Sequence, residues 1–158
     1  MKGFTLVEIL IVLAVLTVMA VVGSINFFNY YSRQNLELTV DEVAALLRDA
    51  QNRSLTQQDG DGDNQGDQWG VHFENATTTR DFVRLFSGSS YASSTVATTN
   101  IFRIGIQFTD PDLGTSKDVI FSKVTGLPDV LVTVTISLIG NPSASSTIYI
   151  NENGRIQY

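Results

Sequence analysis

Two acidic features of the sequence could do chemistry, a single glutamate near the N-terminus and a cluster of four aspartates. Glu8 is the one charged residue in a mostly apolar run from Phe4 to Val22. A charge in such a run is expensive to place in a membrane, so it usually marks a function. The second group consists of four aspartates interleaved with glycine, whose oxygens could surround a hard cation such as Ca²⁺: Asp59, Asp61, Asp63 and Asp67.

Glu8 has a local interpretation at the start of a helix. The segment Thr5-Leu6-Val7-Glu8 fits the pattern Ser/Thr-x-x-Glu. In this capping box the hydroxyl and the carboxylate each accept a backbone N–H that the first helical turn leaves free. Negative charge at this end also complements the helix dipole. The spacing therefore predicts that Thr5 and Glu8 cap a helix.

The acidic segment from Asp59 to Asp67 has two interpretations, a Ca²⁺ site or a solvated acidic loop. It does not match an EF-hand. If Asp59 is counted as the first ligand, the sixth position is Asn64 rather than glycine and the twelfth is Gly70 rather than glutamate. Four like charges in so short a segment repel one another, and a divalent cation would relieve that repulsion.

Composition excludes several classes of protein. The 158 residues leave room for one domain beside the apolar segment, and the net charge of −6 argues against a broad nucleic-acid footprint. The chain has no cysteine, and His72 is its only histidine, so disulfides and imidazole or thiolate zinc sites are excluded. We expect His72, between two apolar neighbours, to be a packing or surface residue. No serine lies in a Gly-x-Ser-x-Gly motif, and nothing indicates an enzyme.

The order of patterns along the chain predicts an α+β fold. One helix is expected from Phe4 to about Leu55, apolar all round over residues 4–28 and amphipathic over residues 29–55. Its expected buried stripe is Leu36, Val40, Val43, Leu47 and Ala50. An acidic Gly/Asp loop at residues 56–68 leads to a β-rich domain at residues 69–158, with a mostly antiparallel sheet that the stripe covers. The expected strands are Trp69–Glu74, Phe82–Ser87, Ile101–Phe108, Asp118–Lys123, Val130–Ile139, Thr147–Asn151 and Arg155–Tyr158.

Two connections in this domain have clear signals. Gly88 to Asn100 is rich in serine and threonine, which predicts a mobile loop. Asn153-Gly154 lies between two apolar stretches and predicts a hairpin turn.

The segment Gly3-Phe4-Thr5-Leu6-Val7-Glu8, with the apolar run after it, resembles the processing motif of type IV pilins and type II secretion pseudopilins. The resemblance implies that a prepilin peptidase removes residues 1–3 as a leader, cutting between Gly3 and Phe4, and that Phe4 becomes N-methylated. It also implies that Glu8 of one subunit neutralises the Phe4 amine of a neighbour during assembly. The pilin fold is a long N-terminal helix packed on a mostly antiparallel sheet, in agreement with the patterns above.

The same resemblance implies partners and a location. The partners are other pilin-like subunits, the prepilin peptidase, an assembly platform of the inner membrane and the lipid bilayer. Lys2 before the apolar run favours a cytoplasmic N-terminus. The protein is then expected to be a single-pass protein of the cytoplasmic membrane, with its C-terminal domain periplasmic or extracellular, until it joins a pilus or pseudopilus.

The C-terminal half resembles one branch, the H-type minor pseudopilins and their pilus relatives. Val119-Ile120-Phe121 before Gly126, and Ile148-Tyr149-Ile150 before Gly154-Arg155-Ile156, carry this resemblance. DNA-binding members of the branch have Gly-Arg-x-Arg at the last position, but Gln157 replaces the second arginine here. Arg155 is therefore a weak nucleic-acid candidate, and a hairpin surface position is the other interpretation. The alternatives to a secretion or pilus subunit are a DNA-uptake pilin and a membrane-anchored binding domain that never polymerises.

Overall fold

The computed structural model describes residues 3–158, and for residues 22–26, 28 and 29 it describes the backbone alone. The leader expected at residues 1–3 therefore lies mostly outside the described residues. The chain divides into two compact units, Met1–Gln34 and Asn35–Tyr158. A single helix, α1 (Leu6–Leu55), contributes to both units.

The first unit consists of the N-terminal part of α1. Every described side chain from Gly3 to Val21 is exposed, including large apolar ones such as Leu6, Leu10 and Leu16. Part of the membrane segment expected at residues 4–28 lies outside the described side chains. Across the described residues, no helical stretch combines the length and the apolarity that a membrane span requires.

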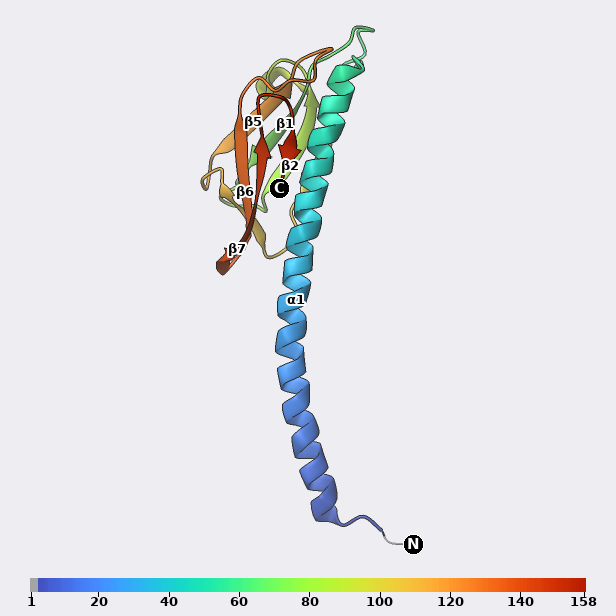
Figure 1. Cartoon of the computed structure of the whole chain (residues 1–158), viewed down its shortest axis with the longest axis vertical. Helices are drawn as coiled ribbons and strands as arrows, with labels where there is room; N and C mark the ends of the chain where they lie inside the picture. The colour runs from blue at the N-terminus through green and yellow to red at the C-terminus, as the bar shows by residue number, and fades with distance from the viewer. Residues whose placement is uncertain (1–2) are drawn as a thin grey trace. The chain divides into compact units, whose positions relative to one another are not determined.

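The second unit places two antiparallel sheets beside the C-terminal part of α1 (Figure 1). The first sheet has the order β3-β2-β1-β5 and the second the order β4-β6-β7-β8. The α+β class is confirmed, with the strands divided between two sheets. The strand bounds are β1 (Trp69–Glu74), β2 (Phe82–Ser87), β3 (Thr95–Ile101), β4 (Ile106–Asp110), β5 (Ser116–Phe121), β6 (Val132–Leu138), β7 (Asn141–Ile150) and β8 (Ile156–Gln157).

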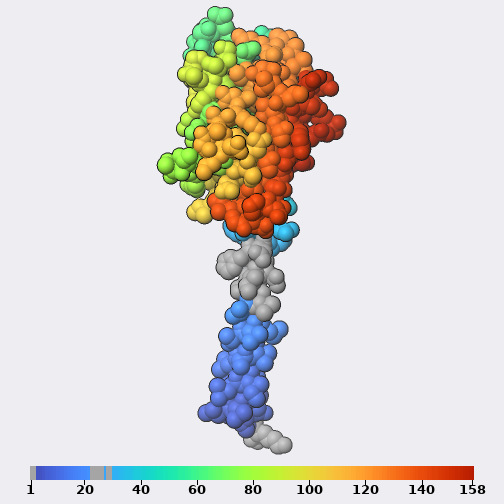
Figure 2. Space-filling view, turned by 90° about the vertical axis from the view of Figure 1, so that its left-hand side faces the viewer, coloured from blue at the N-terminus to red at the C-terminus, as the bar shows by residue number. Residues whose placement is uncertain are grey.

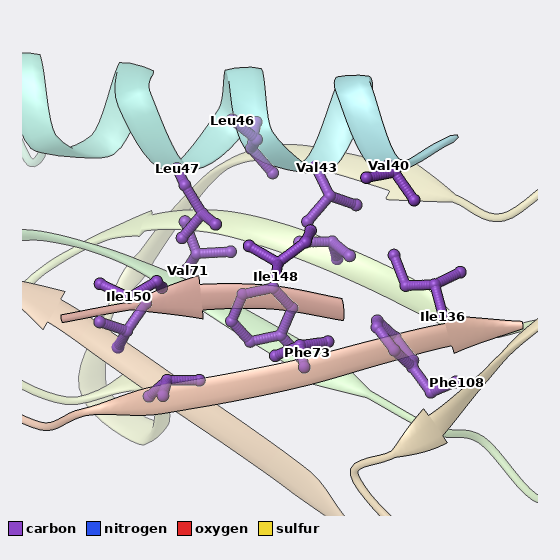
Figure 3. Packing of buried hydrophobic residues seen from close by; sticks show 14 of the residues in the cluster. Val40, Val43, Leu46, Leu47, Val71, Phe73, Phe108, Ile136, Ile148 and Ile150 are labelled. Carbon is purple, nitrogen blue, oxygen red and sulfur yellow. The ribbon is translucent and has the colours of Figure 1, made fainter. Parts of the chain in front are cut away.

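One hydrophobic core joins α1 to both sheets (Figure 3). All five residues of the expected helical stripe are buried, and Leu47 and Ala50 are completely inaccessible. Figure 3 shows Val43 and Leu47 pointing from the helix toward Phe73 of β1 and Ile148 of β7. Each fully buried side chain of this size contributes about 1.5–3 kcal/mol of transfer free energy. This core therefore holds the second unit together without disulfides.

The region between β2 and β4 differs from the prediction. Residues 88–100 are not one loop, because they form a 3₁₀ helix, η1 (Tyr91–Ser93), and most of β3. The single strand expected over residues 101–108 is also wrong. Phe102 turns inward and Gly105 has a left-handed φ of 89°, so the chain leaves the first sheet after Ile101 and enters the second at Ile106.

The remaining boundaries are close to the prediction. β1 and β2 have the expected bounds, and α1 ends at Leu55 as expected, directly before the acidic loop at residues 56–68. The hairpin at Asn153-Gly154 is confirmed, because Ile150 pairs with Ile156 across it. β7 starts earlier than expected, at Asn141, since its exposed serines pair with β6. Figure 2 shows the face of the second unit on which β6 and β7 (orange to red) are exposed.

Candidate functional sites

The N-terminal motif forms the expected capping box. The Thr5 backbone N–H donates to Glu8 Oε2 at 2.8 Å, and the Thr5 hydroxyl donates to the same oxygen at 2.9 Å. The Glu8 N–H donates in return to Thr5 Oγ1 at 3.3 Å. The predicted cap is confirmed, and it fixes the start of α1 beside the candidate cleavage point.

The candidate cleavage point lies in an open segment before the helix. Gly3, Phe4 and Thr5 are outside regular secondary structure and exposed, and the Phe4 side chain is 83% exposed. A Cβ added at Gly3 would meet no atom within 4 Å. Because an extended, uncovered segment is the kind of substrate that a peptidase can bind, this geometry suits proteolysis at the Gly3–Phe4 bond.

Three of the four candidate aspartates come together in the acidic loop. Carboxylate oxygens of Asp59, Asp61 and Asp67 all lie within 4.8 Å of one another. Asp63 does not belong to this group, and its Oδ1 accepts the Gln65 N–H at 2.7 Å. Among the described residues, this is the one set of three or more potential metal ligands whose atoms lie so close together. Together, the three carboxylates of Asp59, Asp61 and Asp67 could hold a hard cation.

Backbone N–H groups already support the first of these aspartates. Asp59 Oδ1 accepts the Gly62 N–H at 2.7 Å, and Asp59 Oδ2 accepts the Asn64 N–H at 2.8 Å. These bonds hold the pKa of Asp59 below its usual range. Asn64 has a left-handed φ of 62°, the conformation for which the sixth position of an EF-hand loop uses glycine. The sequence mismatch at Asn64 therefore does not prevent an EF-hand-like turn, because asparagine adopts this conformation readily.

His72 is buried between two acidic side chains on the first sheet. Its Nδ1 lies 2.5 Å from Asp118 Oδ1 of β5, and its Nε2 lies 3.0 Å from Glu74 Oε2 of β1. The Tyr91 ring stacks on the imidazole with centroids 3.6 Å apart and an interplanar angle of 7°. The side chain packs, as expected, but its two carboxylate partners were not foreseen. The β1–β5 register places Asp118 opposite His72, and Glu74 lies two positions farther along β1.

The two C-terminal motif glycines meet at one side chain of α1. Gln51 Nε2 donates to the Gly126 carbonyl at 2.9 Å and to the Gly154 carbonyl at 3.0 Å. Both glycines have left-handed φ values, 62° and 71°, and a Cβ on either would meet Leu55 or Gln51 within 3.0 Å. Both positions therefore favour glycine strongly. Arg155, next to Gly154, has an exposed side chain in the turn before β8.

Asp81 is a buried carboxyl that the sequence patterns did not single out. It is 5% exposed, and it accepts the Phe108 N–H at 2.6 Å and the Ala76 N–H at 3.0 Å. Burial nevertheless raises the pKa of Asp81. Because it links the segment before β2 to β4 of the other sheet, its role is to hold the two sheets together.

Comparison with known families identifies the N-terminal site. Residues 1–24 match the family model described as the prokaryotic N-terminal methylation motif. A search of curated proteins and a search of solved structures found no match to the chain.

This motif defines the class of protein. It is the signature of precursors whose short leader is removed before the new N-terminus is methylated. Residues 1–24 therefore carry the signature of type IV pilins and pseudopilins, which supports a precursor that is processed by a prepilin peptidase. The signature implies, in general terms, that this peptidase and other pilin subunits are partners.

Proposed function

We propose that this protein is a structural, non-enzymatic subunit of a type II secretion pseudopilus or a type IV pilus, most closely a minor subunit of the H-type. The peptidase cuts between Gly3 and Phe4, and Phe4 is N-methylated. Residues 4–28 anchor the subunit in the cytoplasmic membrane, with residues 35–158 outside, until the helix joins the fibre. The observation that carries this proposal is the methylation motif at residues 1–24.

The exposure of the first unit supports assembly through α1. Its aliphatic side chains cover the helix on all sides, and Leu6, Val18 and Met19 are each at least 65% exposed. Such a surface is unfavourable in water and needs lipid or other apolar helices around it. Both environments are those of a pilin-like subunit, before and after assembly.

Glu8 supports assembly in a defined register. After cleavage, Phe4 carries a positive amine close to the start of an apolar helix. In a bundle of such helices an unpaired charge costs several kcal/mol, so the carboxylate of one copy and the amine of another favour the register that pairs them. The capping bonds of Glu8 to Thr5 use Oε2, so Oε1 is the oxygen that would make this intermolecular pair.

The glycine pair around Gln51 joins the two motifs on which the H-type proposal rests. The two motifs that resemble this branch are 28 positions apart at Gly126 and Gly154, yet their carbonyls accept from the same amide group. Their spacing therefore serves one structural feature rather than two unrelated turns.

Two matched variants test the assembly role of Glu8. Glu8→Gln removes the charge but keeps a capping box, because glutamine also serves at this position. Thr5→Ala removes the capping hydroxyl but keeps the charge. Each variant is expressed with the other subunits, and its incorporation into sheared fibres is compared with its amount in the membrane. We expect Glu8→Gln to reach the membrane and fail to enter fibres, and Thr5→Ala to enter them. If Glu8→Gln assembles normally and Thr5→Ala does not, Glu8 is a helix cap alone.

A further inference from the structure

An exposed apolar patch lies on the second unit, apart from the candidate sites above. We call it the loop-tip patch, and it consists of Ile104, Leu113 and Ile139, which are 86%, 70% and 59% exposed. The three residues come from three different connections, between β3 and β4, between β4 and β5, and between β6 and β7. They line a common pocket of about 280 Å³. Large aliphatic side chains gathered around one hollow commonly mark a contact surface.

The charged side chains of this pocket are Arg80, Arg103 and Asp81, and Arg103 is already paired with the Glu42 carboxylate. Arg80 and Arg103 line it, and Arg80 Nη1 donates to the Phe102 carbonyl at 3.4 Å. Asp81 also lines it, but its carboxyl is buried and accepts backbone N–H groups. The exposed Asp112 is adjacent to Leu113 in sequence. Aliphatic side chains beside the guanidinium of Arg80 suit the boundary between acyl chains and anionic headgroups.

The loop-tip patch lies at the end of the second unit where α1 enters it. Arg103 donates to Thr39 Oγ1 at 3.2 Å and to Glu42 at 2.6 and 2.8 Å, and both partners are within the first turns after Asn35. Figure 1 shows the β6–β7 turn at the same end of this unit, and in Figure 2 that turn (orange-red) projects there as well.

The length of the connecting chain keeps this end near the expected membrane segment. Phe28 and Asn35 are seven positions apart, so their Cα atoms cannot be separated by more than about 25 Å, even by a fully extended chain. This bound holds for any arrangement of the two units. A bilayer that contains residues 4–28 therefore has its surface within about 25 Å of Asn35, which begins the second unit at the end that carries the patch.

We propose that the loop-tip patch binds the surface of the membrane, through anionic phospholipid headgroups and the adjoining acyl chains, while the subunit is stored there. The proposal rests on the membrane-stored state in the proposed function. Ile104, Leu113 and Ile139 enter the acyl boundary, and Arg80 contacts the phosphate groups. This contact orients the second unit on the bilayer, and assembly into a fibre releases it.

The full-length chain reconstituted in vesicles tests the proposal. Because the chain has no cysteine, Ile104→Cys gives a single labelling site for an environment-sensitive fluorophore. Val124→Cys is the matched control, since Val124 is a 62% exposed aliphatic residue whose N–H donates to Ser54, near the opposite end of the second unit's helix. Vesicles of phosphatidylcholine are compared with vesicles that also contain phosphatidylglycerol, each with a quencher attached to the lipid.

We expect lipid-borne quenching several-fold stronger at position 104 than at position 124, and stronger still with phosphatidylglycerol. Arg80→Gln should remove most of the dependence on phosphatidylglycerol, and Ile139→Cys should reproduce the result at a second position. Equal quenching at positions 104 and 124 would overturn the proposal. Protection at position 104 that grows with protein density rather than lipid composition would instead assign the patch to contacts between copies.

Flotation of the vesicles separates this proposal from the one on which it rests. A chain that floats with the vesicles but shows no difference between the two positions contradicts the patch alone. A chain that does not float contradicts membrane storage, and the loop-tip patch proposal falls with it.

Discussion

Binding of Ca²⁺ by the acidic loop can be tested with single-residue precision. The carboxylates of Asp59, Asp61 and Asp67 form one group, and Asp63 lies outside it. We predict that Asp61→Asn removes the effect of Ca²⁺ on stability and that Asp63→Asn leaves most of it. The two substitutions delete the same charge from the same exposed loop, so each controls for the other.

The expected size of the effect follows from linkage. A ligand that binds only the folded state adds about 2.7 kcal/mol to the free energy of unfolding when its free concentration is about a hundredfold above Kd. For a unit the size of residues 35–158, about 1 kcal/mol shifts the melting temperature by about 4 °C. Saturating Ca²⁺ should therefore raise the melting temperature of the wild type by about 10 °C.

The assay is thermal unfolding of the full-length chain in detergent, followed by circular dichroism, in millimolar Ca²⁺ and in chelator. Mg²⁺ at the same concentration controls for ionic strength, because its strict octahedral geometry suits this flexible loop poorly. Identical melting temperatures for the wild type in Ca²⁺ and chelator would refute the reasoning. The segment would then be a solvated acidic loop that its own backbone N–H groups already hold.

The pH dependence of this effect has a defined sign. The folded-state pKa of Asp59 is lowered by the N–H groups of Gly62 and Asn64. Its contribution is therefore fully present above the unfolded pKa of about 3.9 and is lost as the pH falls through the lower folded value. The Ca²⁺ shift should persist at about pH 5 and disappear at more acidic pH, when the carboxylates become protonated.

Two further substitutions test the second unit. Asp81→Asn should lower the free energy of unfolding by about 1–3 kcal/mol, because an amide NH₂ would face one of two buried N–H donors. Urea unfolding measures this change, with the exposed Asp112→Asn as the control. Equal stability of the two variants would contradict the prediction. His72→Phe keeps a ring under Tyr91 but loses both carboxylate partners. Since Glu74 and Asp118 are about 40% exposed and stay hydrated, the cost should be about 1–2 kcal/mol in the same assay, and an unchanged midpoint would show that stacking alone holds His72.

Local patterns account for the features of the fold that were predicted correctly. The helical stripe ending at Leu47 and Ala50 follows from a period that one helix imposes on its own residues. The capping box needs only Thr5 and Glu8, three positions apart. Both features depend on neighbours in sequence, so the sequence alone specifies them.

Tertiary contacts account for what was missed. β3 carries little apolar alternation and is exposed along most of its length, so its strand structure depends on pairing with β2. The 3₁₀ helix before it is held by the stacking of Tyr91 on His72. The separation of Asp63 from the other loop carboxylates is likewise a matter of backbone conformation, which alternating Asp and Gly residues leave open.

The central claim is that a prepilin peptidase converts this chain into an assembly-competent subunit by cutting before Phe4. The most direct test is mass spectrometry of the N-terminal peptide from protein purified out of membranes and fibres of cells that contain the peptidase, with a peptidase-deficient strain as the control. The account predicts a peptide that begins at Phe4 and carries one methyl group on its amine, and a precursor that begins at Met1 in the deficient strain. Fibre-incorporated protein that still begins at Met1 would contradict the account.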